Sequence, residues 1–474
     1  MRELWNYSKT VYEKILPFFF FLVILMQSLQ HIPRWDLLDQ IAVADRFVSE
    51  IEAYPAIDSN YLGGVSVYFP GVALIGVLAQ KLVPSDFLVV SLLVFATIVT
   101  FSFIFIQKII TSFIDKDYIG TNFWPMIIII SGLVARDWLY YSIEFKPDTI
   151  AFLLGFSVLI ISRKVESHSY LYHFFLGLIF GSILIFKQQY IAFILGYAFF
   201  ALVIRRAREI LFLFGALTAS SAVVFCLWYL ETPWFWTVEI LADDGFLGPL
   251  EWIDSHLGFG FVLCAGFLCF VLIRRGHIID DINKVSGILK ENIKKPWLYI
   301  ILPASIAAFL GSFKVGGNSG NTALSIMLLS PLILILSQRL NYNLLLLASI
   351  VVMTLNIKSV ANTPRHVQEI IQVRAYVEDA IIDGCGATVI GSNVYYAVRD
   401  KLSGCEYENY WTHSLLNNSN VSNGYEISSF IHDERIKYFV IENLPVNLKL
   451  LKGSADIELL FVNDIAIVAQ RKGL

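Results

Sequence analysis

Long apolar stretches separated by short polar segments occupy the first 357 residues of the chain. A transmembrane helix needs about 17–25 mostly apolar residues, and this pattern predicts about eleven such helices. The predicted spans are 15–32, 87–107, 118–136, 148–162, 171–186, 190–204, 210–229, 257–273, 297–313, 322–338 and 343–357. One further stretch, 65–83, has enough residues to cross a membrane but contains Pro70, Gly71 and Gly76.

After residue 357 the apolar segments become shorter and alternate with charged residues. Residues 365–382 have the pattern of a helix, and four short apolar runs are typical of strands. These runs are ATVIGS (387–392), KYFVIEN (437–443), ELLFV (458–462) and AIVAQ (466–470). The sequence therefore predicts an all-α polytopic membrane domain over 1–357, followed by a small water-soluble α/β domain over 358–474.

The composition supports a membrane protein. Apolar residues make up 57% of the chain and charged residues 16%, whereas soluble proteins average roughly 45–50% and about 25%. So much apolar surface excludes a soluble enzyme, a nucleic-acid-binding protein and a disordered protein. The charges also differ between the domains, because 25 of the last 117 residues are charged and only 49 of the first 357 are.

The positive-inside rule decides how the stretch 65–83 is placed. If this stretch lies on the outer surface, 17 of the 24 Lys and Arg residues before residue 358 face the cytoplasm. If it is a full span, only 8 of them do. We therefore predict that 65–83 is an interfacial or re-entrant helix, that the N-terminus is cytoplasmic, and that the C-terminal domain is extracytoplasmic.

Two cysteines, Cys385 and Cys405, lie in this predicted outer domain. They could form a disulfide if the compartment is oxidising. Two buried free thiols are the alternative, and the sequence leaves both open.

Acidic residues gather in the first predicted outer loop, 33–64. Asp36 follows the first span by about four residues, and Asp39 would share a helical face with it at a spacing of three. A carboxylate held at the membrane surface is a candidate general base or cation ligand. The alternative is a solvated acidic loop, which we favour for the later acidic residues but not for Asp36.

The second outer loop, 136–148, contains Arg136, Glu144 and Asp148. Asp148 stands where the chain re-enters the membrane. The tripeptide Lys-Pro-Asp that ends this loop is also typical of a helix start, because proline suits the first turn and aspartate complements the helix dipole. Asp148 is therefore either a site residue or a helix-start residue.

Isolated lysines lie at the outer ends of two other spans. Lys187 directly follows the fifth span, with almost no loop before the sixth, and Lys314 lies in FKVGGNSGN. Cations at this depth need a partner, and a phosphate at headgroup level suits them. Their alternative role is to reach toward lipid phosphates.

These residues, in this order, resemble the polytopic glycosyltransferases of the GT-C fold over about residues 10–340. Relatives include protein O-mannosyltransferases, the lipid A aminoarabinose transferase and bacterial members of families 39 and 83. Asp36 resembles the catalytic Asp of the first outer loop, and Tyr68-Phe69-Pro70 resembles the Y-x-P juxtamembrane helix. Asp148 matches the Asp that opens a later helix, Lys187 matches the Lys of a T-K-G motif, and Asn318 lies in a run like G-G-N-x-x-N-Y.

The chain also departs from the family pattern. The proline doublet is Pro-Gly, the T-K-G motif is Phe-Lys-Gln, and Asn321 is followed by threonine instead of an aromatic residue. The resemblance therefore supports the class of enzyme but names no substrate.

The resemblance implies a hexosyl- or pentosyltransferase of cell-envelope glycan synthesis in the bacterial inner (plasma) membrane. It would move a sugar from a polyprenyl-phosphate (or diphosphate) donor to a lipid, glycan or protein acceptor at the outer face, with inversion. Asp36 would be the base, and Asp148 or Asp39 would orient the acceptor or hold a divalent cation. Lys187, with Lys314 or Arg136, would bind the phosphate. The remaining expected substrate-binding residues are Glu144, Tyr68 and Asn318.

Two other functions remain open from the sequence. One is a transporter or flippase of lipid-linked glycans, and the other is a polysaccharide polymerase or ligase. Transporters often contain internal repeats and midplane charges, whereas this chain has no clear repeat and most of its charges map to span ends. The acidic first loop and the outer α/β domain also fit an enzyme that works at the membrane surface.

Overall fold

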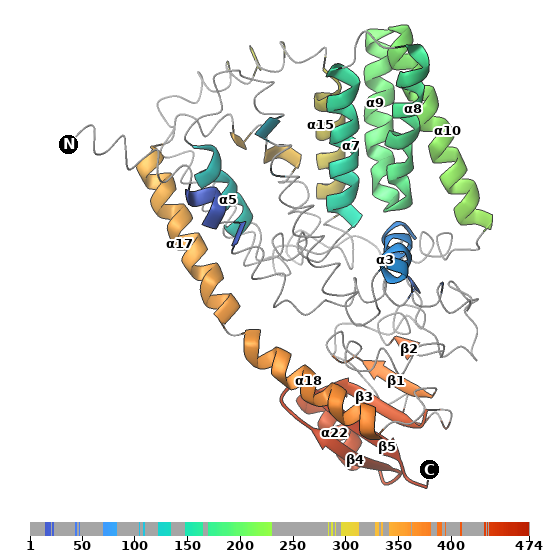
Figure 1. Ribbon diagram of the computed structural model, residues 1–474, viewed down its shortest axis with the longest axis vertical. Helices are drawn as coiled ribbons and strands as arrows, with labels where there is room; N and C mark the ends of the chain where they lie inside the picture. Colours follow the sequence, from blue (N-terminus) through green and yellow to red (C-terminus); the bar gives the residue numbers. More distant parts are fainter. Residues whose placement is uncertain are drawn as a thin grey trace. The chain divides into compact units, whose positions relative to one another are not determined.

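A computed structural model describes the helices and strands of this chain (Figure 1). The described residues are 15–19, 21–22, 43–44, 47, 70–82, 104, 108–109, 122–133, 147–164, 169–229, 283, 286–287, 290, 295–311, 328–330, 333–334, 341–361, 363–380, 386–390, 394, 408–409, 431–432, 434 and 436–473. The chain divides into two compact units, and each is described by itself. The predicted domain limits, 1–357 and 358–474, stay a prediction.

The first unit comprises Met1–Ser28, Val94–Trp228 and Leu241–Lys358, and its described elements are helices. They are α5 (Phe123–Leu133), α7 (Pro147–Lys164), α8 (Tyr170–Ser182), the 3₁₀ turns η2 (Ile183–Ile185) and η3 (Gln188–Tyr190), α9 (Ile191–Ile204), α10 (Ala207–Tyr229), α15 (Pro296–Gly311) and α17 (Tyr342–Ala361). Each of the seven α-helices falls on a predicted span, which confirms the helical prediction at seven places, and η3 lies at the junction of two predicted spans. The other four predicted spans lie wholly or mostly outside the described residues.

Within the described residues, α10 is the one helix that is both long enough and apolar enough to cross a membrane by itself. It has 23 residues, which corresponds to about 34 Å at about 1.5 Å per residue. Several of its large apolar side chains are exposed, including Phe214, Phe225 and Trp228. Such a surface suits lipid. The predicted total of about eleven spans stays a prediction.

Glycines allow α8 and α10 to pack backbone against backbone. A Cβ atom at Gly177 or Gly181 of α8 would clash with the carbonyl oxygen of Phe212 or Ala216 on α10. Gly215 of α10 meets α8 in the same way at Phe174. Gly177 and Gly181 are four residues apart, the spacing by which small residues bring membrane helices into close contact. The sequence analysis did not identify this contact.

A proline and a glycine bring α9 and α15 together. Pro303 lies inside α15 and has no N–H to donate to the carbonyl of Tyr299, four residues earlier. That carbonyl oxygen lies against Gly196 of α9, where any Cβ atom would clash with it. The Tyr299 ring also packs between Phe199 and Phe200, with ring centroids 5.6 and 5.5 Å away. The Tyr299 carbonyl oxygen, which receives no hydrogen bond from Pro303, therefore lies against Gly196, where α9 has no side chain.

The link between α9 and α10 is only two residues long. Arg205 ends α9 with φ of 52°, and its N–H bonds to the carbonyl of Ala201 at 2.8 Å. The Tyr197 hydroxyl donates a hydrogen bond to the Glu209 carboxylate, and the Tyr197 ring stacks on Phe212 with centroids 4.3 Å apart. A buried tyrosine hydroxyl usually finds such a partner. These contacts join α9 to the first turn of α10.

The second unit comprises Leu29–Leu93, Tyr229–Ile240 and Ser359–Leu474. It contains α3 (Gly71–Leu82), which begins directly after Pro70 and packs through Ala73 against Val43 and Ala44. Its 12 residues extend about 18 Å, whereas the hydrocarbon core is about 30 Å thick. This confirms a helix within 65–83, and the length as described is too short for a span. Its position at the membrane interface stays a prediction.

The C-terminal part of this unit is an α/β fold, as predicted. Its strands are β1 (Ala387–Ile390), β2 (Glu408–Asn409), β3 (Tyr438–Glu442), β4 (Ile457–Val462) and β5 (Ala466–Arg471). The sheet order is β2-β1-β3-β5-β4, in which β1 is parallel to β2 and β3, and β5 is antiparallel to β3 and β4. The four predicted strands are confirmed, and the two-residue β2 was missed.

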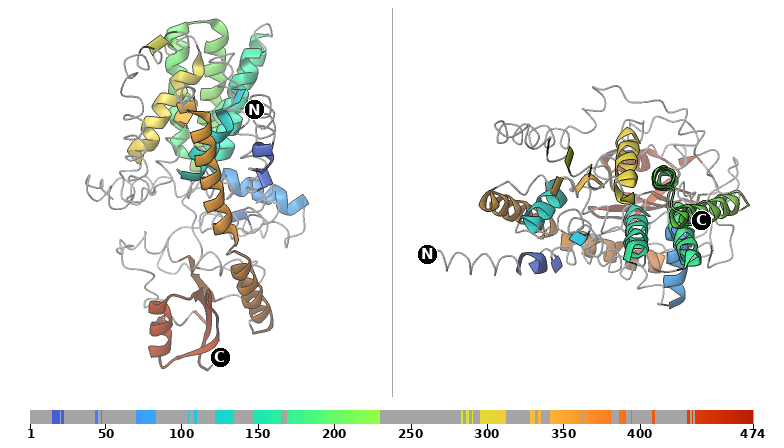
Figure 2. Two further views of the ribbon diagram at one scale, coloured as in Figure 1. Left: turned by 90° about the vertical axis from the view of Figure 1, so that its left-hand side faces the viewer. Right: turned by 90° about the horizontal axis from the view of Figure 1, so that it is seen from above.

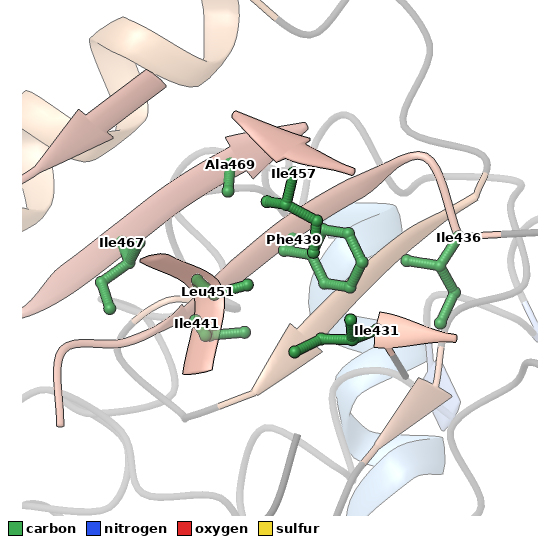
Figure 3. Close-up of a cluster of buried hydrophobic side chains, with 8 residues drawn as sticks. All are labelled: Ile431, Ile436, Phe439, Ile441, Leu451, Ile457, Ile467 and Ala469. Carbon is green, nitrogen blue, oxygen red and sulfur yellow. The ribbon is translucent and has the colours of Figure 1, made fainter. Parts of the chain in front are cut away.

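Two helices cover opposite faces of this sheet, α18 (Thr363–Ala380) and α22 (Pro445–Gly453) (Figure 2). The face toward α22 forms the core that Figure 3 shows, where Leu451 of α22 meets Phe439, Ile441 and Ile467. On the other face, Tyr376 of α18 stacks on Phe461 with ring centroids 4.9 Å apart. Helix α18 confirms the helix predicted at 365–382, whereas α22 was not predicted.

Asn463 ties the β4–β5 turn to α18. Its side-chain oxygen accepts hydrogen bonds from the N–H groups of Ile465 and Ala466 at 3.1 and 2.8 Å. Its side-chain nitrogen donates to the carbonyl of Glu369 in α18 at 3.0 Å. One asparagine therefore closes the hairpin and holds the helix against the sheet.

We predict that Gly181→Ala destabilises the protein, because the new Cβ atom must push α10 away from α8. A loss of about 1–3 kcal/mol is expected for such overpacking. The matched control is Gly453→Ala at the end of α22, where a Cβ atom would meet nothing within 4 Å. Thermal unfolding of the full chain in detergent should show a lower midpoint for the first variant only. Equal midpoints for the two variants would contradict the packing described.

We also predict that Glu442→Gln, at the end of β3, raises the thermal stability of the protein by an amount that depends on pH. Burial raises the pKa of the Glu442 carboxyl above its usual range, so the folded state holds this proton more tightly than the unfolded state. That group's contribution to stability therefore falls as the pH rises from its unfolded pKa through its raised folded pKa. The variant should unfold at a higher temperature than wild type at pH 7.5, and the difference should shrink near pH 4.5. A difference that grows on acidification would contradict the cause given.

Candidate functional site

The best-described candidate residue, Lys187, lies in a tight turn between α8 and α9. Helix α8 passes into η2, Phe186 and Lys187 follow, and η3 leads directly into α9. The Phe186 N–H bonds to the Ile183 carbonyl at 3.1 Å, and the Tyr190 N–H bonds to the Lys187 carbonyl at 3.2 Å. This confirms the prediction that almost no loop separates the fifth and sixth spans.

The residues around Lys187 anchor this turn in the protein. Phe186 and Tyr190 are 7% and 2% exposed, whereas Lys187 is only half-buried. The Tyr190 ring lies 5.4 Å from Phe193 and 5.7 Å from Phe152, edge to face in both cases. Two buried aromatic residues therefore fix the backbone on either side of the lysine.

Asp148 is the second residue of α7, which begins at Pro147. This placement confirms that Lys-Pro-Asp marks a helix start, and it leaves the proposed site role open. Phe152 stands one turn further along α7, is fully buried, and contacts both Tyr190 and Phe193. The end of α7 that carries Asp148 therefore lies beside the turn that carries Lys187.

This arrangement brings together groups that suit a phosphate. The first turn of a helix has unpaired N–H groups and the positive end of the helix dipole. The half-buried Lys187 adds a full positive charge near the N-terminal end of α7. Asp148 belongs to the first turn of α7, and an aspartate can in general accept a proton or hold a cation.

The other seven candidate site residues lie outside the described residues. They are Asp36, Asp39, Tyr68, Arg136, Glu144, Lys314 and Asn318. Cys385 and Cys405 lie outside them as well. Their predicted roles stay predictions.

Metal binding was expected only through the acidic candidates. Within the residues described, no group of three or more His, Cys, Asp or Glu side chains is placed to hold a metal ion. Asp36 and Asp39 are outside that part of the chain, so their proposed role as cation ligands is not tested.

Sequence reasoning missed Gln189, which lies in η3 two residues after Lys187. Its side-chain oxygen Oε1 is buried and has no hydrogen-bond partner among the residues described. No sequence signal pointed to Gln189, because the departure from the T-K-G motif falls on Gln188, the residue directly after Lys187.

Comparison with known proteins gives a structural relative only. No family model and no curated protein matches this sequence. The chain is similar to ArnT from Cupriavidus metallidurans, in crystal structures bound to undecaprenyl phosphate (TM-score 0.61) and in the apo state (TM-score 0.58). In both cases the identity is 11%, and the match covers 96% of this chain and 97% of the other. The chain therefore has the fold of ArnT, in agreement with the resemblance in its sequence to a family that includes the aminoarabinose transferase.

Proposed function

We propose that this chain is an integral membrane glycosyltransferase that takes a sugar from a polyprenyl-phosphate donor at the outer membrane face. One observation carries the proposal: a protein with the same fold over 96% of this chain has been crystallised with undecaprenyl phosphate. The turn around Lys187 adds local support, because it places a cation beside the N-terminal end of a helix.

The proposed chemistry is a single displacement at the anomeric carbon of the donor sugar. The acceptor hydroxyl attacks this carbon, the bond to the phosphate oxygen breaks, and the polyprenyl phosphate leaves with the bonding electrons. Negative charge grows on the phosphate during this step, so a preorganised cation such as Lys187 stabilises the transition state. Attack from the side opposite the phosphate inverts the anomeric configuration.

A base must take the proton from the acceptor hydroxyl. We assign this role to Asp36, with Asp148 or Asp39 orienting the acceptor or holding a divalent cation. Arg136 or Lys314 would assist Lys187 at the phosphate, and Glu144, Tyr68 and Asn318 would contact the substrates. The acceptor is a lipid, a glycan or a protein.

The test is turnover of a radiolabelled polyprenyl-phosphate sugar by the purified full chain in liposomes. An enzyme releases the label from the polyprenyl phosphate and transfers it to an acceptor or to water. A flippase moves the intact lipid between leaflets and leaves the sugar attached. Intact donor after incubation with all candidate acceptors, together with leaflet exchange, would replace the enzyme proposal by the transporter. Growth of one glycan chain by repeated additions would instead indicate a polymerase.

We predict that Asp36→Ala and Lys187→Met both abolish most of the transfer without lowering the thermal unfolding midpoint. Loss of a general base costs about 10²–10⁴-fold, and loss of one charge-stabilising group costs about 10²–10³-fold. The matched control is Lys449→Met, because Lys449 is an exposed lysine on α22. Near-normal turnover in Asp36→Ala would rule out this base.

We further predict that Asp148→Asn separates the two roles considered for this residue. Loss of a favourable charge at a helix N-terminus costs about 0.3–1 kcal/mol of stability, which leaves the protein folded. A role in the site predicts at least a tenfold fall in turnover in protein that is still folded. Normal turnover with a slightly lower unfolding midpoint would assign Asp148 to the helix start alone.

A further inference from the structure

The side-chain amide of Gln189 lies two residues after Lys187 and has no role in the proposed function. Its Oε1 atom is buried and has no hydrogen-bond partner in the part of the chain that the structure describes. A buried acceptor without a partner costs about 1–3 kcal/mol, and native proteins keep few such groups. An ordered water or a bound ligand can supply the missing partner, and the position two residues after Lys187 favours a ligand.

The backbone around Gln189 is held firmly. The Tyr190 N–H bonds to the Lys187 carbonyl at 3.2 Å, and the buried Tyr190 ring packs on Phe152 and Phe193. The 3₁₀ turn that contains Gln189 also contacts η2, α9 and α15. The backbone of Gln189 is therefore fixed in the turn. Gln189 is two residues after Lys187 in the sequence.

The chemistry of Oε1 limits what the partner can be. An amide oxygen only accepts hydrogen bonds, and so do the oxygens of an ionised phosphodiester. Oε1 therefore cannot bond to the phosphate that Lys187 is proposed to bind, and only the Nε2 group of the same amide can donate to a phosphate oxygen. In a sugar phosphate, the nearest groups that can donate a hydrogen bond are the hydroxyl or amino substituents of the sugar.

We propose that Gln189 recognises the sugar of the donor by accepting a hydrogen bond from one of its hydroxyl or amino groups. This inference rests on the proposed function, in which Lys187 binds the adjoining phosphate. Rotation about the last torsion of a glutamine side chain is soft, so Oε1 can turn from its buried position to meet the ligand. Gln189 is then a specificity-determining residue, and the proton-transfer step does not need it.

The experiment compares binding of two lipids to the full chain in detergent. One is undecaprenyl phosphate alone, and the other is undecaprenyl phosphate carrying the radiolabelled sugar that the wild-type protein transfers. Gln189→Met keeps the length of the side chain and removes its hydrogen-bonding groups. It should weaken binding of the sugar-bearing lipid about 3- to 10-fold, as expected for one hydrogen bond, and should leave binding of undecaprenyl phosphate unchanged.

Three further variants complete the comparison. Lys187→Met should weaken binding of both lipids, and Gln470→Met, the same substitution on strand β5, should weaken neither. Gln189→Asn, which shortens the side chain but keeps its amide, should show the same selective loss and covers the case in which the methionine variant does not fold. In steady-state turnover, the loss in Gln189→Met should appear as a higher KM for the donor, with kcat less affected.

The outcomes separate this inference from the proposed function. Equal weakening of both lipids by Gln189→Met would show that Gln189 contacts the phosphate, and no change for either lipid would make it a packing residue. Both results overturn the inference while leaving the glycosyltransferase proposal in place. If the wild-type protein transfers no sugar at all, the proposed function fails and the inference fails with it.

Discussion

The close approach of α8 and α10 at Gly177, Gly181 and Gly215 is the constraint on which the described part of the first unit depends. Lipid is as apolar as the helix surfaces, so burial of apolar surface contributes little free energy to the association of these helices. Contact between backbones adds dispersion attraction, and it places the Ser220 hydroxyl of α10 3.3 Å from the Gly181 carbonyl oxygen of α8. Once α8 is held in this way, the turn that follows it has a defined position.

The turn after α8 carries Lys187, the residue proposed to bind the donor phosphate. The aromatic contacts of Tyr190 with Phe152 and Phe193 lock α7 and α9 at the level of Lys187. They bring a lysine and the N-terminal end of a helix together without any long loop. A rigid turn loses little entropy when it binds an anion, which suits a site that must stabilise charge only as it develops. Gln189 belongs to the same turn and shares its rigidity.

How well each feature could be predicted depends on how local its cause is. The helix α3 follows from an apolar run that begins directly after a proline, and the helix start at Pro147-Asp148 follows from neighbouring residues alone. The four longer strands follow from their own apolar runs. Strand β2 was missed because two residues paired with β1 carry no pattern. The buried Gln189 oxygen and the contacts of Gly181 were missed because both depend on residues far along the chain.

The sequence by itself indicated that most of this chain belongs in lipid, where seven of its helices lie, and that a small α/β domain follows, and it predicted which charges face outward. These properties come from composition and from periodicities of a few residues, so no distant contact is needed to establish them. Only the tertiary structure decided that the Asp148 end of α7 lies beside the Lys187 turn. The reason is physical: α7 and α9 meet through the rings of Phe152, Tyr190 and Phe193, and packing between helices is not encoded in any single segment.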